Sequence, residues 1–137
     1  MDFNGAVTYL QNYFSTEWNS LTDIVERNEF YTATAQEAYV GHEFVEAIAY
    51  EPKIGRKYGS VGETRIRHEG IWTIKVMSVL GSGVESTLSN RLKEIAECKS
   101  MSGIITYPAN QTYSGKSIRK GFWEEQYAIR FTFDEVK

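Results

Sequence analysis

Few residues of this chain are of the kinds that build reactive sites: it has one cysteine, two histidines and two prolines. A single thiol excludes an internal disulfide and fits a reducing compartment. Apart from Lys99, no Lys or His lies near Cys98 in the sequence. We therefore interpret Cys98 as a buried structural thiol late in a helix, rather than as a nucleophile.

A positive net charge and a long apolar run are also missing. The formal net charge of −3 argues against general nucleic-acid binding, although it leaves room for locally basic loops. No apolar stretch approaches the ~18 residues of a membrane-spanning helix. The N-terminus lacks the basic region of a secretory signal. We expect no membrane partner, and a protein used in the cytosol or carried in a particle assembled there.

No motif that would carry a reaction is complete. One loop contains a Gly-Lys-Ser triplet, but Asn110 stands where a phosphate-binding loop needs its first glycine. His42 shares a strand face with Glu46, and no further metal ligand can be identified there. Glu124 and Glu125 are neighbours in a strand and so face opposite ways, which we interpret as a solvated strand end. We expect no catalytic, cofactor or metal site.

What the chain does have is a globular composition, with 42% hydrophobic, 14% aromatic and 24% charged residues. A length of 137 residues with this profile predicts a single domain over residues 1–137. The many aromatic residues suit either a packed core or interfaces, where Tyr and Trp are enriched.

Apolar periodicity predicts the elements of that domain. Stripes with three- and four-residue spacing predict two helices, Asp2–Leu21 and residues 83–98, with Gly103 as a candidate stop for the second. Alternation predicts strands at Ile24–Val25, His42–Glu51, Thr64–Leu80, Ile104–Tyr107 and Phe122–Val136. Two polar segments are predicted to be surface loops: Arg27–Tyr39 and Ala109–Gly121.

The strand over Thr64–Leu80 is long enough to shape the fold. At ~3.3 Å per residue it would reach roughly 55 Å, beyond a small core. Either a bulge bends it near Gly70, or its first half projects from the body with the end of the preceding strand. The charges of Arg65, Arg67 and Glu69 favour projection. The element order predicts an α+β fold: an antiparallel four- to five-stranded sheet with two helices packed on one face and a projecting hairpin.

Two loops concentrate positive charge in this acidic chain. Their cations are Lys53, Arg56 and Lys57 in the first loop, and Lys116, Arg119 and Lys120 in the second. These residues are either ordinary solvated loop residues or docking points for an acidic partner surface or for DNA phosphates.

The chain thus has an amphipathic N-terminal helix, a strand ending near Pro52, a Gly-rich connection and a long strand with a central glycine (Arg67–Val76). A Gly-Ser-Gly turn, a helix and a strand of alternating aromatics follow. This order resembles the tail-terminator and minor tail proteins of long-tailed bacteriophages. The resemblance covers most of the chain, except that Arg27–Tyr39 aligns with nothing in the family.

The resemblance implies a structural virion protein without catalytic activity. It implies a hexameric ring that caps the tail tube, ends tail growth and meets the head-tail connector or neck protein, with DNA passing through the lumen without specific binding. A closed ring needs two different patches on each subunit. We expect one on a hairpin from Tyr50 to Arg67 and the other on the outer faces of strands 64–80 and 122–136. The expected assembly residues are Lys53, Arg56, Lys57, Tyr58, Arg65, Arg67, Lys116, Arg119 and Lys120.

Three alternatives stay open. The first is another neck or tail-completion adaptor of the same virion. The second is a small hydrolase or nuclease, which would need His42 or His68 in a cleft with a carboxylate. The third is a ligand- or nucleic-acid-binding module that uses the two basic loops.

Overall fold

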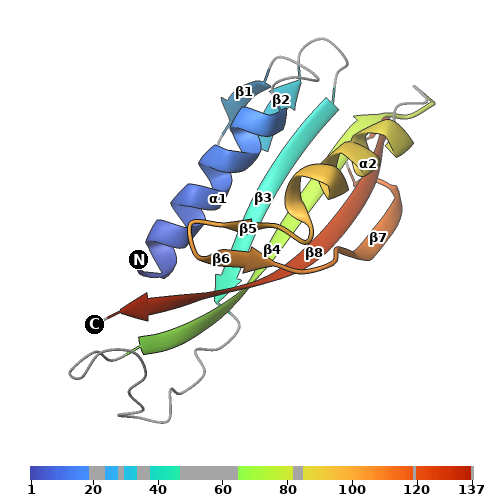
Figure 1. Cartoon of the computed structure of the whole chain (residues 1–137). Helices are drawn as coiled ribbons and strands as arrows, with labels where there is room; N and C mark the ends of the chain where they lie inside the picture. The colour runs from blue at the N-terminus through green and yellow to red at the C-terminus, as the bar shows by residue number, and fades with distance from the viewer. Residues whose placement is uncertain are drawn as a thin grey trace.

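The computed structural model describes residues 1–18, 24–27, 30–33, 38–46, 65–81, 85–118 and 120–136. Within these ranges the chain forms two helices and eight strands (Figure 1). In chain order they are α1 (Phe3–Trp18), β1 (Ile24–Arg27), β2 (Phe30–Ala33), β3 (Ala38–Glu46), β4 (Arg65–Val79), α2 (Glu85–Ala96), β5 (Ser100–Met101), β6 (Ile104–Thr106), β7 (Asn110–Lys116) and β8 (Phe122–Val136).

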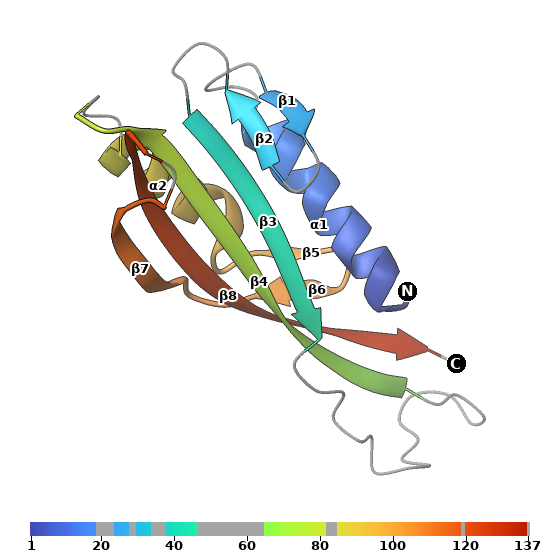
Figure 2. The same cartoon turned by 180° about the vertical axis from the view of Figure 1, so that it is seen from behind.

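The strands make one antiparallel sheet in the order β1-β2-β3-β4-β8-β6-β5, and β7 pairs with β8 beside β6. Both helices lie on the same side of this sheet, as the two opposite views show (Figures 1 and 2). The α+β class, the antiparallel sheet and the placement of the helices are therefore confirmed. The prediction of four to five strands was too low, because segments expected to be loops also join the sheet.

The two longest strands, β4 and β8, pair at the centre of the sheet. Their register is unbroken over the whole of β4, so the predicted alternative of a bulge near Gly70 is wrong. Strand β3 pairs with β4 only as far as Gly70, and the first residues of β4 continue beyond it with β8 alone (Figure 2). Among the described residues, the projecting half of β4 is therefore supported by the last strand rather than by the preceding one.

The core lies between the sheet and the two helices. Even-numbered residues of β4 and odd-numbered residues of β8 face the helices, as strand alternation requires. The largest fully buried side chains include Phe14 and Trp18 of α1, Trp72 and Ile74 of β4, Leu88 and Leu92 of α2, and Ile129 and Phe131 of β8. The predicted apolar stripes of both helices are confirmed for the described residues, as is the half-buried alternation of β8.

Helix α1 begins as the sequence predicts, because the Asp2 side chain accepts a hydrogen bond of 2.7 Å from the Gly5 N–H. It ends at Trp18 in the described residues, and residues 19–21 lie outside them. The helix also contacts α2, where the Tyr13 hydroxyl donates to the Ile95 carbonyl at 2.7 Å. Burial raises the pKa of Tyr13 above 10.0, and the neighbouring carboxylate of Glu17 adds to the rise.

Helix α2 ends at Ala96, before the predicted stop at Gly103. Cys98 adopts a left-handed backbone with φ of 55°, which the helix cannot continue through. The buried Thr106 hydroxyl donates to the Ala96 carbonyl at 2.6 Å and accepts from the Lys99 N–H at 2.8 Å, which closes the helix end. Cys98 is exposed at this turn, so its interpretation as a buried thiol is wrong.

Two segments predicted to be loops are strands. The segment Arg27–Tyr39 contains β2 and the first residues of β3, and β2 also forms a hairpin with β1. The segment Ala109–Gly121 contains β7, whose residues pair with the first half of β8. These strands are rich in Thr, Tyr and polar residues, so they show no apolar alternation and owe their structure to the neighbouring strand.

Candidate assembly site

The side of the sheet away from the helices, here named the outer face, carries no helix among the described residues (Figure 2). The register places Val45 of β3 beside Ile71 of β4, and Ile71 beside Arg130 of β8. The Tyr107 N–H bonds to the Arg130 carbonyl at 3.0 Å and extends this row to the sheet edge. Val45 on β3 and Ile105 on β6 are 51% and 43% exposed, so apolar side chains face outward on both sides of the β4–β8 pair.

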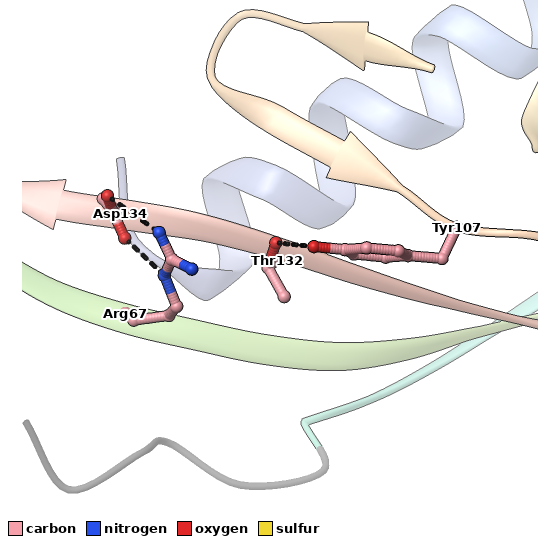
Figure 3. Close-up of polar contacts among 4 residues, drawn as sticks. All are labelled: Arg67, Tyr107, Thr132 and Asp134. Atoms are coloured by element: carbon pink, nitrogen blue, oxygen red, sulfur yellow. Dashed lines mark hydrogen bonds and ion pairs between the residues drawn. The ribbon is translucent and has the colours of Figure 1, made fainter. Parts of the chain in front are cut away.

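Two ion pairs cross the outer face between β4 and β8. Arg67 Nε lies 3.0 Å from Asp134 Oδ1, and Arg130 Nη1 lies 2.9 Å from Glu69 Oε1 (Figure 3 shows the first pair). The Arg67 side chain is 52% exposed, so its pair contributes at most about 1 kcal/mol to folding. The main effect of the two pairs is to hold four charges in place with a net charge of zero.

Tyr107 follows β6 and reaches across the same face to β8 (Figure 3). Its hydroxyl lies 3.3 Å from Thr132 Oγ1, and its ring centroid lies 4.0 Å from the Arg130 guanidinium carbon. Thr132 is buried as a result. The phenol ring therefore fixes the Arg130 head group by a cation–π contact as well as by the ion pair to Glu69.

The projecting part of the β4–β8 pair, residues 65–69 with residues 132–136, is named the arm. On its inner side the Nε2 atom of His68 lies 2.8 Å from a Glu135 oxygen, and the imidazole stacks on Phe133 with centroids 4.8 Å apart. The His68 side chain is only 12% exposed. The arm is thus braced on both sides, by this contact and by the Arg67 ion pair.

The turn between β7 and β8 presents a second surface, named the basic tip, made of Lys116, Ile118 and Lys120. All three side chains are exposed, and Ile118 is 105% exposed, so none of the described residues covers it. Two backbone hydrogen bonds of 2.9 Å hold the turn, one from the Ser117 N–H to the Phe122 carbonyl and one from the Leu80 N–H to the Gly121 carbonyl. A hairpin turn usually carries polar residues or glycine, so an isoleucine at this place is unusual.

The two adjacent carboxylates at the start of β8 point to opposite sides, as predicted. Glu125 accepts a hydrogen bond of 2.7 Å from Ser89 of α2, whereas Glu124 accepts one of 3.1 Å from Ser117 in the basic tip. Both carboxylates are half-buried, so the interpretation as a solvated strand end is wrong. The helix covers one of them and the β7–β8 turn covers the other.

The predicted assembly residues divide into four groups. Those outside the described residues are Lys53, Arg56, Lys57, Tyr58 and Arg119. Arg65 lies in β4, at a position where the side chain is not described. Arg67 belongs to the outer face, and Lys116 and Lys120 belong to the basic tip.

The structure keeps Arg67 apart from the basic tip. Arg67 pairs with residue 134 of β8 and Lys116 pairs with residue 123, so roughly 36 Å of strand separates them. The sequence analysis missed Tyr107, Arg130 and Asp134. The alternation of Arg130 and Asp134 with apolar residues in β8 was visible, but the partners of all three residues follow only from the strand register.

Among the described residues, no three His, Cys, Asp or Glu side chains lie close enough together to hold a metal ion. No helix in the described part of the chain is long and apolar enough to cross a membrane.

Comparison with known proteins finds no matching family, curated protein or solved structure. The fold itself defines an α+β protein whose sheet is covered by helices on one face, while its outer face carries paired charges and exposed apolar residues.

Proposed function

We propose that this chain is a structural virion protein that caps the tail tube of a long-tailed bacteriophage as a hexameric ring. In this role it ends tail elongation and joins the tail to the head. Its partners are the tail tube protein and a head-tail connector or neck protein. Its place is the tail–head junction of the virion, after assembly in the host cytoplasm, and it needs no cofactor.

The observation that supports this proposal most is the composition of the outer face. Val45, Ile71 and Ile105 bring apolar side chains to a surface that no described helix covers. Apolar surface in contact with neighbouring chains is the usual driving force of assembly. In a ring, such an apolar face would be buried against a neighbouring subunit. In a monomer it would stay exposed to water, which is unfavourable.

The matched charges of the outer face also favour a protein neighbour over DNA. Arg67 and Arg130 each already have a carboxylate partner. A DNA phosphate would have to compete with those carboxylates, so the face offers little net attraction to nucleic acid. This property suits a ring through which DNA slides without binding.

The first test of the proposal is the mass of the assembly. Native mass spectrometry of the purified protein, alone and with tail tube protein, is expected to show a hexamer bound to the tube. A protein that stays monomeric in both samples would contradict the proposal.

A second test separates the terminator from the adaptor. Electron microscopy of particles made without this protein is expected to show overlong tails. Tails of normal length without heads would instead assign the protein as a neck or tail-completion adaptor.

One contact favours the hydrolase alternative enough to be tested. His68 and Glu135 form a histidine–carboxylate pair, which is an element of many catalytic sites. The pair lies on the arm against Phe133, with no metal cluster among the described residues. Assays for hydrolase and nuclease activity, metal analysis, and the variants His68→Ala and His42→Ala decide this point. An activity that His68→Ala abolishes would replace the assembly proposal.

The nucleic-acid alternative depends on the exposed lysines of the basic tip. A DNA titration at low salt is expected to show no binding, because the chain as a whole is acidic. Binding that weakens steeply with salt would support that alternative instead.

A further inference from the structure

The basic tip is a preformed protrusion rather than a loose turn. Ser117 donates its N–H to Phe122 and lies between Met77 and Glu124, with its hydroxyl 3.4 Å and 3.1 Å from their side-chain atoms. Leu80, at the end of β4, holds the other side of the turn through its N–H. Ile118 is thus presented to solvent from a braced base, so ordering the tip costs little when it binds.

The basic tip is complementary to a surface that is both apolar and acidic. Ile118 supplies a fully exposed apolar side chain, and Lys116 and Lys120 place positive charge on either side of it. The whole chain has 15 Lys and Arg against 18 Asp and Glu, so without these two lysines the rest has 13 against 18. The tip is therefore a local positive feature of an acidic molecule.

A surface of the required kind is present on the same chain. Val45 is 51% exposed on the outer face, with the half-buried Ile71 beside it on β4. Glu43 is exposed on the same face of β3, one row further along. These three residues are named the β3 patch. Charges within a Debye length of about 8 Å attract each other even when both molecules carry a negative net charge.

The two surfaces cannot meet within one copy. The tip lies beside Trp123 at the start of β8, whereas the β3 patch lies level with Arg130. Seven residues of extended strand separate these positions, which corresponds to roughly 23 Å. A contact between tip and patch must therefore join two copies, and because the two surfaces differ, the contact is head-to-tail.

From this complementarity we infer that the basic tip of one copy docks on the β3 patch of the next copy. Ile118 packs against Val45 and Ile71, while the tip lysines face Glu43. The inference rests on the proposed ring, and it identifies the contact by which neighbouring subunits of that ring would meet. It also assigns the partner of the tip as a second copy of this chain, rather than DNA or a lipid surface.

Two variants place a charge on either side of the inferred contact: Ile118→Asp in the tip and Val45→Asp in the patch. Each is expected to weaken self-association about tenfold or more, since burial of one such side chain contributes at least that factor. The conservative variants Ile118→Val and Val45→Ile should assemble like the wild type. Thr8→Asp is a matched charge control, because it also adds one negative charge and Thr8 is exposed on α1, away from both surfaces. Thermal melts establish that every variant is folded.

Mixing the two aspartate variants tests the head-to-tail geometry directly. Each keeps one intact half of the interface, so a mixture can form one good contact and should give a heterodimer that neither variant forms alone. Native mass spectrometry with one variant isotope-labelled measures this, alone and with tail tube protein. Aspartate variants that assemble as well as the wild type, or a mixture without heterodimer, would overturn the inferred contact while leaving the ring proposal intact.

Two other results would also overturn the inference. A wild type that stays monomeric in both samples would remove the ring and this contact together. If the wild type instead sediments with vesicles of anionic phospholipid while Ile118→Asp does not, that result would assign the tip to a membrane surface.

Discussion

Adding a single methyl group at Gly70 is expected to lower the free energy of unfolding markedly. This glycine lies in the middle of β4, opposite Phe131 of β8. A Cβ atom built on Gly70 would come within 2.7 Å of Phe131 Cε1 and 2.9 Å of Phe3 Cε2, and closer still to Phe131 Cζ. Distances under 3.0 Å essentially never occur for real Cβ atoms. The two stacked phenyl rings thus pack directly against the Cα atom of Gly70, where no side chain fits.

The magnitude for Gly70→Ala follows from two opposing effects. Overpacking a well-filled core costs about 1–3 kcal/mol of unfolding free energy, because the rings and the backbone must shift. Removing a glycine reduces the entropy of the unfolded chain and returns about 0.4–1 kcal/mol. Neither ring can retreat easily, since Phe131 is fully buried and its neighbour Phe3 stacks on it at 5.9 Å. We expect a net loss of about 1–2 kcal/mol, or roughly 3–10 °C in Tm.

Urea and thermal unfolding measure this loss directly. Gly115→Ala is the matched control, because the nearest obstacle there is the hydroxyl of the exposed Tyr113 at 3.0 Å, which can move aside. Adding Phe3→Leu to Gly70→Ala should recover part of the loss in a double-mutant cycle. An unchanged or higher Tm for Gly70→Ala would show that the close packing of the rings over this strand is wrong.

Three further substitutions test contacts elsewhere in the fold. Thr106→Val should lower the unfolding free energy by about 1–3 kcal/mol in urea titrations, because it leaves the Ala96 carbonyl unpaired in a buried place. The folded pKa of Tyr13 lies above its unfolded value of 10.0, so its contribution to stability is complete below about pH 10 and is lost as pH rises through the folded pKa. Tyr13→Phe should therefore flatten the decline of Tm above pH 10. Arg67→Ala should change Tm little, since its pair with Asp134 is exposed and such pairs contribute under about 1 kcal/mol.

The long, strongly patterned elements were predictable from the sequence for a simple physical reason. In β4 and β8 the largest apolar side chains recur at every second residue over Trp72–Val76 and Tyr127–Phe133, and only one choice of inner face buries these two runs. The stripe of α1 from Leu10 to Trp18 likewise fits one helix face. These elements define the α+β class and the side on which the helices lie.

The edge strands were not predictable, because their own side chains do not decide their structure. In β7 every residue except Gly115 is exposed, so nothing in its pattern marks an inner face. Its hydrogen bonds to β8 form only once the β7–β8 turn brings the two segments together. The exposed position of Cys98 was missed for a related reason, since the end of α2 is fixed by Thr106, ten residues beyond the last helical residue.

The candidate site shows the same division between pattern and pairing. The alternation of charged and apolar residues in β4 was enough to place Arg67 on the face away from the core. It could not show that Asp134 would neutralise this cation, because 67 residues separate the partners and only the register joins them. For this reason Arg67 was predicted together with the lysines of the basic tip, from which the structure separates it.

The pairing of Arg67 changes what each surface can recognise. A cation held by a carboxylate is a poor anchor for a phosphate but a well-positioned element of a protein interface, where matched charges lose less on leaving water. The tip lysines have no such carboxylate among the contacts described, and they flank the most exposed isoleucine of the described chain. Among the described residues, the tip thus places two exposed lysines at one end of the sheet, while the outer face offers apolar area and the exposed acid Glu43. Two unlike surfaces at different places on one subunit favour directional assembly over symmetric pairing of like faces.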